Sequence, residues 1–359
     1  MKGFGNCYRG RRVLLTGHTG FKGSWLAFWL TELGAEVVGV ALDPNTLPNH
    51  WDLLGLDICE HRLDIRDSEN IASLVVNTKP EIVFHLAAQP LVRRSYRDPL
   101  ETWSTNVMGT ALLLDACRKT DAVRAIVVVT SDKCYANQEW EWGYRETDRL
   151  GGHDPYSASK AATELVVDSY RRAFFHGPEA PLVATGRAGN VIGGGDWSED
   201  RLIPDLVRAM ATGSGLEIRS PNATRPWQHV VESLSGYLLL GQKLLERRRE
   251  FAESWNFGPE AEGNCTVAEM LARLATNWPG LAWHTTSQLQ PHEANLLYLD
   301  SARSRTRLGW RPVWGIDRAL SSTSDWYRAY LSAGRVDSRV QLEEFTTTAQ
   351  VAGLDWAVS

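Results

Sequence analysis

Tyr156 and Lys160 are four residues apart, a spacing that puts both side chains on one face of a helix. An ammonium group beside a phenol favours the phenolate, so we expect Lys160 to lower the pKa of Tyr156 from about 10 toward the working pH. Tyr156 could then take the proton of a sugar hydroxyl while a nicotinamide cofactor accepts the hydride. Ser131, which follows a predicted strand, would hold the same hydroxyl. These three side chains together indicate the oxidation of an alcohol.

Three glycines, Gly17, Gly20 and Gly23, are spaced three apart between a predicted strand and a predicted helix. A turn of this kind lets backbone N–H groups approach a pyrophosphate at the N-terminus of the following helix. Thr19 and Phe21 lie inside the turn and are expected to contact the same ligand. The turn therefore predicts that the nicotinamide cofactor is a dinucleotide.

A carboxylate after the second predicted strand indicates which dinucleotide is bound. Asp43 lies twenty residues after Gly23, where a carboxylate accepts hydrogen bonds from the adenosine ribose and repels a 2′-phosphate. The expected cofactor is therefore NAD rather than NADP. Asp64 follows a further short run, and it either contacts the adenine or is an ordinary loop carboxylate.

These side chains depend on strands and helices that alternate over residues 10–188, a pattern typical of an α/β fold with a doubly wound parallel sheet, the Rossmann type. The predicted strands are the apolar runs Val13–Thr16, Glu36–Val40, Ile82–Ala87, Ala125–Thr130 and Leu182–Ala188. The predicted helices cover Trp25–Leu33, Pro99–Lys119 and Pro155–Arg172. Ligands of such sheets bind at the carboxyl ends of the strands, where the glycine turn and Ser131 would meet.

Beyond residue 188 the alternation becomes irregular, which predicts a smaller C-terminal α/β domain for the substrate. We assign residues 189–229 and 256–335 to it, expect 230–255 to pack back on the NAD-binding domain, and expect 336–359 to be a peripheral tail. Loops are predicted at Gly193–Asp196 and Gly213–Arg225, and helices at Ile203–Thr212, Val231–Arg249, Val267–Asn277 and Asp300–Leu308.

The composition limits the classes of protein and of ligand. The formal net charge is −5, which argues against a nucleic-acid binder, since such proteins usually carry a basic face. Five widely spaced cysteines without a Cys-x-x-Cys pair predict neither disulfides nor a metal site, and suit a reducing compartment. The first residues do not resemble a signal peptide, and no apolar run approaches the ~20 residues that span a bilayer. We therefore expect a cytoplasmic enzyme that binds no metal and no membrane.

Several motifs together resemble a known family. The chain is similar to the extended short-chain dehydrogenase/reductases that act on nucleotide sugars, and within them to the CDP-glucose 4,6-dehydratases. The motifs that carry this resemblance are GHTGFKGSWL at Gly17–Leu26, HLAAQP at His85–Pro90, TSDKCY at Thr130–Tyr135, DPYSASK at Asp154–Lys160, RPWQHV at Arg225–Val230, WNFG at Trp255–Gly258 and LDSARSRTRLGW at Leu299–Trp310. The first and last of these motifs are shared across much of the superfamily. Ser131-Asp132-Lys133 and the exact sequence GHTGFKG of the glycine turn point to the CDP-glucose enzymes.

The resemblance implies the 4,6-dehydration of a nucleoside diphosphate glucose, CDP-glucose being the expected substrate and NAD a cofactor that is not consumed. Oxidation at C4 acidifies the C5 proton, a base removes it while an acid helps the C6 hydroxyl leave as water, and C6 is then reduced. Asp132 is the expected acid and Lys133 the expected base, where related dehydratases carry an Asp-Glu pair. A lysine base must be neutral when it acts, which burial beside Lys160 would favour. The alternative is that Asp132 and Lys133 form a surface ion pair.

By the same resemblance, further residues would contact the two ligands. Besides the turn, Tyr156 and Lys160, those expected to bind NAD are Leu86, Ala87, Ala88 and Asn106, of which Asn106 or its neighbour Thr105 would brace the site. Those expected to bind the nucleotide sugar are Gln89, Ser95, Asn190, Arg201, Arg225 and His292, with Arg187 and Glu293 as weaker candidates. Arg225 is the favoured ligand of the pyrophosphate, because a guanidinium binds phosphate oxygens in a fork.

Two other functions would use some of the same residues. A nucleotide-sugar 4-epimerase needs Tyr156 and Lys160 but no acid and base for water loss, so Asp132 and Lys133 argue against it. A non-catalytic NAD-binding regulator would have little reason to keep Ser131, Tyr156 and Lys160 together. Because the helices Pro99–Lys119 and Pro155–Arg172 resemble a paired-helix contact of this superfamily, a homodimer or homotetramer is expected.

Overall fold

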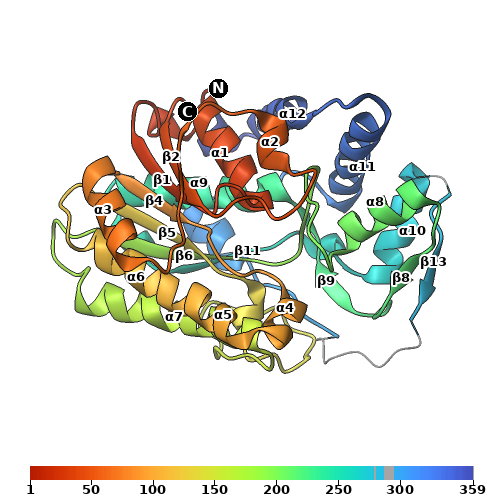
Figure 1. The fold of residues 1–359 in the computed structure, drawn as a ribbon, viewed down its shortest axis with the longest axis horizontal. Coiled ribbons are helices and arrows are strands. Elements are labelled where there is room, and N and C mark those ends of the chain that lie inside the picture. The colour runs from red at the N-terminus through yellow and green to blue at the C-terminus, as the bar shows by residue number, and fades with distance from the viewer. Residues whose placement is uncertain (279, 287–294, 359) are drawn as a thin grey trace.

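The centre of the molecule is a sheet of seven strands, all paired in parallel (Figure 1). The structure is a computed structural model and describes residues 1–278, 280–286 and 295–358. The order across the sheet is β11-β6-β5-β4-β1-β2-β3. Its strands are β1 (Arg12–Thr16), β2 (Glu36–Ala41), β3 (Cys59–Arg62), β4 (Ile82–His85), β5 (Ala125–Val129), β6 (Leu182–Ala188) and β11 (Ser254–Phe257). This is the doubly wound parallel sheet that the apolar runs predict.

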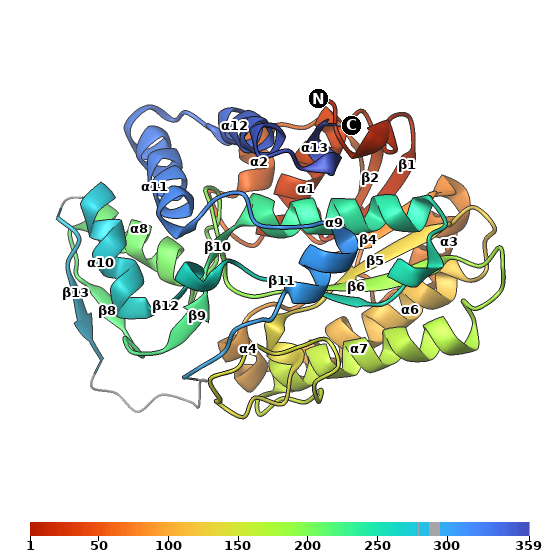
Figure 2. The ribbon, with the colours of Figure 1, turned by 180° about the vertical axis from the view of Figure 1, so that it is seen from behind.

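Helices cover both faces of the sheet, as Figures 1 and 2 show from opposite sides. One face packs against α1 (Phe21–Glu32) and α9 (Val230–Leu245), and the other against α3 (Ser68–Thr78), α6 (Gly109–Cys117) and α7 (Pro155–Ala173). Side chains of β1 alternate between these layers, Val13 and Leu15 entering the first and Leu14 the second. Burial on both faces explains why inner strands such as β4 and β5 are continuous apolar runs, whereas the edge strand β3 is polar and largely exposed. The shorter helices of this region are α2 (His50–Leu54), α4 (Val92–Arg97) and α5 (Pro99–Trp103), with 3₁₀ turns at Phe4–Asn6, Asp132–Cys134 and Arg249–Phe251.

A second group of elements lies beyond the carboxyl ends of the strands, with a hydrophobic cluster of its own. Its helices are α8 (Leu202–Thr212), α10 (Val267–Asn277) and α11 (Ile316–Ala333). Its strands form three short pairs: β7 (Val191–Ile192) with β10 (Gln228–His229), β8 (Leu216–Ile218) with β13 (Trp283–Thr285), and β9 (Thr224–Pro226) with β12 (Asn264–Thr266). A 3₁₀ turn at Ala261–Gly263 completes it, whereas the π turn at Ser304–Leu308 returns to β11 of the central sheet, where Leu308 joins the hydrophobic layer of α1 and α9. The predicted loop Gly213–Arg225 thus contains β8 and most of β9, strands too short to show an alternating pattern.

The C-terminal residues are part of the core, which corrects the expectation of a peripheral tail at 336–359. Helices α12 (Ser338–Val351) and α13 (Asp355–Val358) return to the N-terminus, and both chain ends lie together in Figure 2. Phe345 is fully buried and Trp356 is 3% exposed. Trp356 stacks on Phe4 with ring centroids 4.9 Å apart. The polar residues that dominate α12 conceal a narrow apolar stripe, which explains the mistaken expectation.

We expect Trp356→Ala to destabilise the protein by about 3–5 kcal/mol, because it empties a large buried site between aromatic rings. The free energy of unfolding in urea, followed by circular dichroism, measures the loss. Trp142→Ala is the matched control: Trp142 is mostly exposed, and its removal should change the unfolding free energy by less than about 0.5 kcal/mol. Equal losses in the two variants would show that the C-terminal helices contribute no more than a surface residue.

Candidate active site

A cavity of about 680 Å³ opens at the carboxyl ends of the parallel strands and extends to helix α8 and strand β8. The predicted residues that line it are Gly17, Thr19, Gly20, Phe21, Gly23, Asp43, Asp64, Leu86, Ala87, Ala88, Gln89, Ser131, Asp132, Lys133, Tyr156, Lys160, Asn190, Arg201 and Arg225. Residues from both the sheet domain and the second group of elements therefore meet around one space.

The glycine turn packs more closely than any side chain would allow. Gly17 has a φ of 75°, and a Cβ there would lie 2.7 Å from the backbone nitrogen of Ala87. A Cβ at Gly23 would collide with the carbonyl oxygen of Gly17. No described side chain caps helix α1 at Gly20, so the first N–H groups of the helix stay available beside the cavity. This cradle suits a pyrophosphate, which fits the dinucleotide expected there.

The two carboxylates beyond the turn differ in their surroundings. Asp43 follows β2 with its side chain 86% exposed, and its Oδ1 lies 3.2 Å from Nε of Arg62. Asp64 accepts hydrogen bonds from the Arg66 guanidinium, which holds the pKa of the Asp64 carboxyl below its usual value. Both carboxylates border the cavity, and Asp43 is the one that solvent reaches freely.

The loop after β4 forms the next part of the wall. The predicted strand Ile82–Ala87 ends at His85 because the N–H groups of Leu86 and Ala87 turn to donate to Oγ1 of Thr16, each at 3.1 Å. The loop then continues into Gln89, whose side chain donates to the Leu91 carbonyl oxygen and to Thr102 Oγ1. These hydrogen bonds hold the loop after β4 in place as part of the cavity wall.

Two predicted contact residues act behind this wall instead of lining it. Asn106 exchanges two hydrogen bonds with the backbone of Gln89, at 2.8 and 3.1 Å, and also donates to Ser159 Oγ at 2.9 Å. Ser95 Oγ accepts from the N–H of Tyr156 at 3.1 Å, at the start of α7. These residues support the positions of Gln89 and Tyr156, while Thr105 is the neighbour of Asn106 that borders the cavity.

Ser131, Asp132 and Lys133 follow β5 in a 3₁₀ turn. Ser131 Oγ donates to Oδ1 of Asp132 at 2.9 Å and accepts from the N–H of Lys133 at 3.2 Å. Asp132 is buried, and its Oδ2 has no hydrogen-bond partner among the described residues. Burial raises the pKa of the Asp132 carboxyl above its usual value, because the charged form loses its hydration. Since Asp132 is buried beside the cavity, it is not a member of a surface ion pair.

Tyr156 and Lys160 project from the first turns of α7, where Pro155 and the capping bond of Asp154 to the N–H of Ser157 begin the helix. Burial raises the pKa of Tyr156 to about 12, against the opposing effect of a hydrogen bond with Ser131. Burial also lowers the pKa of Lys160 to about 8, and its Nζ donates to the Val129 carbonyl oxygen at 3.3 Å. The expected lowering of the Tyr156 pKa is therefore not found, because desolvation of the phenol dominates.

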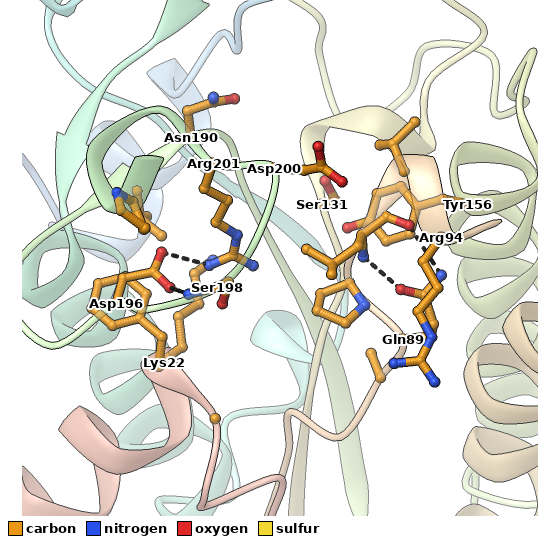
Figure 3. Close-up of a pocket in the computed structure, with 18 of the residues that line it drawn as sticks. Lys22, Gln89, Arg94, Ser131, Tyr156, Asn190, Asp196, Ser198, Asp200 and Arg201 are labelled. Carbon is orange, nitrogen blue, oxygen red and sulfur yellow. Dashed lines mark hydrogen bonds and ion pairs between the residues drawn. The ribbon is translucent and has the colours of Figure 1, made fainter. Parts of the chain in front are cut away.

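The facing wall comes from the loop after β7 and from β9. In Figure 3, Arg201 points toward the cavity from the side opposite Ser131 and Tyr156. Its guanidinium is held by Asp196 Oδ2 at 2.8 Å. Arg225 is buried on β9, and Asn190 follows β6. This wall carries the cationic groups that an anionic substrate would need.

Among the remaining predicted residues that the structure describes, Arg187 does not reach the site. Arg187 forms a fully buried ion pair with Glu164, at 2.8 Å, and so corrects its weak assignment as a substrate ligand. His292 and Glu293 lie outside the described residues. Over the described part of the chain, no group of His, Cys, Asp and Glu side chains could hold a metal ion. No helix found there has the length and apolar character to cross a membrane.

Lys22 is a cavity residue that sequence reasoning missed. Burial lowers the pKa of its ammonium to about 7, with Arg201 and Lys160 acting in the same direction and Asp132 against it. Its Nζ lies 3.5 Å from the hydroxyl of Tyr237. The signal was present in the sequence, since a lysine within a turn built for phosphate stands next to the expected ligand.

Comparison with known proteins gives consistent findings. A family model described as GDP-mannose 4,6 dehydratase matches residues 14–323. The CDP-glucose 4,6-dehydratase of Salmonella typhimurium is 47% identical over 333 residues, which cover 91% of this chain and 93% of that relative. The likeness therefore extends over nearly the whole of both chains.

Two solved structures share the fold. MoeE5 in complex with UDP-glucose and NAD is 27% identical, with a TM-score of 0.74, over 89% of this chain and 100% of that one. The dTDP-glucose 4,6-dehydratase DesIV from Streptomyces venezuelae, with NAD and TYD bound, has a TM-score of 0.77. It is 24% identical and is covered over 97% of its length, against 88% of this chain.

Proposed function

Because the chain belongs to the GDP-mannose 4,6-dehydratase family, we propose that it is an NAD-dependent hydro-lyase that converts CDP-glucose to CDP-4-keto-6-deoxyglucose and water. The Salmonella CDP-glucose 4,6-dehydratase, at 47% identity, supports the choice of CDP-glucose. The observation that carries the reaction type is the Ser131-Asp132-Lys133 turn, which borders the same cavity as Tyr156 and Lys160 and in which Ser131 and Asp132 are buried and Lys133 is half-buried. An epimerase would not need the acid and base of that turn.

NAD would be held by the glycine turn and by Asp43. The MoeE5 complex, which contains NAD, supports this cofactor. Bound NAD⁺ would supply the oxidant for C4 of the sugar and, once reduced, the hydride for C6. Asp43 would bind the ribose hydroxyls, and its carboxylate would repel a 2′-phosphate.

Tyr156, Ser131 and Lys160 would serve the oxidation. The phenol oxygen of Tyr156 takes the proton of the C4 hydroxyl, and Ser131 Oγ, which bonds to the same phenol, holds that hydroxyl in place. Burial lowers the pKa of Lys160 to about 8, so its ammonium is charged below that pH. Lys160 lies one turn of α7 away from Tyr156. The charged ammonium favours the phenolate of Tyr156, which is the form that accepts the proton of the C4 hydroxyl and becomes the phenol in this step.

Asp132 and Lys133 would serve the loss of water. Lys133 takes the proton from C5, and the C5–H electron pair forms the double bond to C6. The C6 hydroxyl leaves with the proton of Asp132, so that one water is released. Burial raises the pKa of the Asp132 carboxyl, which is the direction that suits a general acid, and its Oδ2, which has no partner among the described residues, would deliver the proton.

Arg201, Arg225 and Asn190 would bind the diphosphate and the sugar. Arg201 enters the cavity with Asp196 fixing the direction of its guanidinium, and Arg225 is buried on the same side. A fixed guanidinium suits phosphate oxygens because it offers two parallel donors. The negative charge of the substrate would therefore face the wall opposite the catalytic turn.

The decisive experiment incubates the purified protein with CDP-glucose and catalytic NAD⁺ and measures the alkaline absorbance of the 4-keto-6-deoxy product. dTDP-glucose, UDP-glucose and GDP-mannose are run in parallel. We expect product from CDP-glucose above the other three. Conversion of the sugar to its 4-epimer without that absorbance would identify an epimerase. Absence of any product from all four substrates would contradict the dehydratase assignment.

We also propose that two copies associate through α5, α6 and α7. Large apolar side chains are exposed on α5 (Leu100 and Trp103), on the π turn Ser104–Met108 that joins α5 to α6 (Met108) and on α7 (Leu165). Leu100 is 79% exposed, which is costly unless another surface covers it. Light scattering after size-exclusion chromatography tests this, and a monomer would overturn it. The cytoplasmic location stays a prediction from the composition.

A further inference from the structure

A buried ion pair lies directly behind the catalytic turn and has no part in the reaction described above. Glu164 and Arg187 have side chains only 2% and 3% exposed. The Glu164 carboxylate accepts two bonds from the guanidinium, Nε to Oε1 at 2.9 Å and Nη2 to Oε2 at 2.8 Å. It also accepts from the hydroxyls of Thr130 at 2.5 Å, Thr185 at 2.8 Å and Ser254 at 3.1 Å. Five donors thus converge on one carboxylate.

These bonds hold both ends of the catalytic turn. Thr130, which precedes Ser131, is bonded to Glu164 directly. Tyr135, which follows the turn, accepts a hydrogen bond from Nη1 of Arg187 at 2.8 Å and donates to Asn256 at 2.7 Å. Glu164 itself is on α7, one turn beyond Lys160. A single ion pair therefore connects the turn that carries the acid and base to the helix that carries Tyr156 and Lys160.

We propose, on the basis of the function proposed above, that Glu164 is a positioning residue: it aligns the Ser131–Lys133 turn against α7 and keeps Lys160 charged for the oxidation. Replacing Arg187 or Glu164 alone would leave one buried charge without its partner, which is costly. The pair is therefore a constraint that the active site cannot lose without rearranging.

The titratable groups around Lys160 explain how Glu164 helps to keep its ammonium charged. On its own helix Glu164 raises the pKa of Lys160, and Cys134 of the 3₁₀ turn acts in the same direction. His85 of β4 and Lys22 of α1 also face it, and Lys160 lowers the pKa of each. Glu164 is the larger of the two groups that oppose the desolvation of the Lys160 ammonium. Without its charge, Lys160 should lose its proton at a lower pH.

The first test is Glu164→Gln, which keeps the shape and removes the charge. We expect kcat for 4-keto-6-deoxy product to fall about 10- to 100-fold with KM little changed, since a misplaced acid and base slow the chemistry more than binding. A group whose pKa falls loses its proton sooner as the pH rises. The alkaline limb of the kcat profile should therefore move down by about one pH unit, the effect of removing a nearby opposite charge.

Glu232→Gln is the matched control. Glu232 is also a fully buried carboxyl group, but burial raises its pKa to about 8, and it accepts from the N–H groups of Val313 and Trp314, away from the cavity. We expect it to lower the unfolding free energy without moving the pH profile. If both variants show the same kcat and the wild-type profile, Glu164 is merely structural and the proposal is overturned. Should Glu164→Gln fail to fold, Glu164→Leu/Arg187→Met removes both charges together and is judged by the same profile.

A readout without turnover separates this proposal from the proposed function. The rate of acetylation of Lys160 by acetic anhydride, followed by mass spectrometry across a range of pH, reports the fraction of neutral amine. We expect the midpoint to lie lower in Glu164→Gln than in wild type and Glu232→Gln. A wild-type protein inert toward CDP-glucose would contradict only the substrate, whereas an unmoved midpoint would contradict the role of Glu164.

Discussion

A Tyr156→Phe variant is expected to lose product formation by about 10³- to 10⁴-fold, at the upper end of the range for removing a proton-transfer group. The phenol oxygen takes the C4 proton in the proposed mechanism, and no water can replace it easily because Tyr156 is buried. The loss should affect the first step, so no reduced cofactor should accumulate. Product is measured by its alkaline absorbance, and reduced cofactor by its near-ultraviolet absorbance in a single turnover.

Tyr170→Phe provides the matched control for this variant. Tyr170 is on the same helix but near its C-terminal end, away from the cavity, where its ring contacts Phe174 and Phe175. The control should keep wild-type activity, because the same hydroxyl is deleted without touching the site. A Tyr156→Phe protein that binds NAD normally and keeps a tenth or more of the activity would remove Tyr156 from its role.

The parallel sheet could be predicted because its physical cause is local. Strands buried on both faces must be apolar throughout, and runs such as Ile82–His85 and Ala125–Val129 meet that requirement. Once the sheet is parallel, its carboxyl edge brings the turn after β1 and the turn after β5 together. The convergence of Gly17 and Ser131 on one cavity therefore followed from the pattern of elements alone.

The position of the Asn106 side chain could not be predicted from the sequence around it. The sequence predicts one helix over Pro99–Lys119, but the chain forms a π turn at Ser104–Met108 within it. A π turn inserts a residue and rotates all side chains that follow, and such turns are frequent at functional sites. Thr105 therefore borders the cavity while Asn106 bonds to the backbone of Gln89. Propensities along the chain carry no signal for that rotation.

Arg187 and Tyr156 illustrate effects that depend on three-dimensional surroundings. Arg187 is a weak candidate for the substrate by the family resemblance, yet in β6 it meets Glu164 from α7, a different element. The pKa of Tyr156 was expected to fall beside Lys160, but burial acts in the opposite direction and is larger. Neither the partner of a buried charge nor its desolvation can be derived from residue spacing.

A Lys133→Met variant is expected to stop the reaction after oxidation, lowering product formation by about 10²- to 10⁴-fold. Tyr156, Ser131 and Lys160 are unchanged, so C4 should still be oxidised, and reduced cofactor should build up instead of being used. Methionine keeps most of the length of the side chain beside Asp132. The measurement compares reduced cofactor and 4-keto-6-deoxy product in the same single-turnover experiment.

An Asp132→Asn variant separates the role of the acid from that of the base, because the two groups act on different bonds. In deuterium oxide, a variant with its base intact should exchange the C5 proton of the oxidised sugar even when water leaves slowly. We therefore expect deuterium at C5 in Asp132→Asn and none in Lys133→Met, although both form little product. Exchange at the wild-type rate in Lys133→Met would place the base elsewhere. Loss of exchange in both variants would mean that Asp132, whose Oδ2 has no described partner, also orients the base.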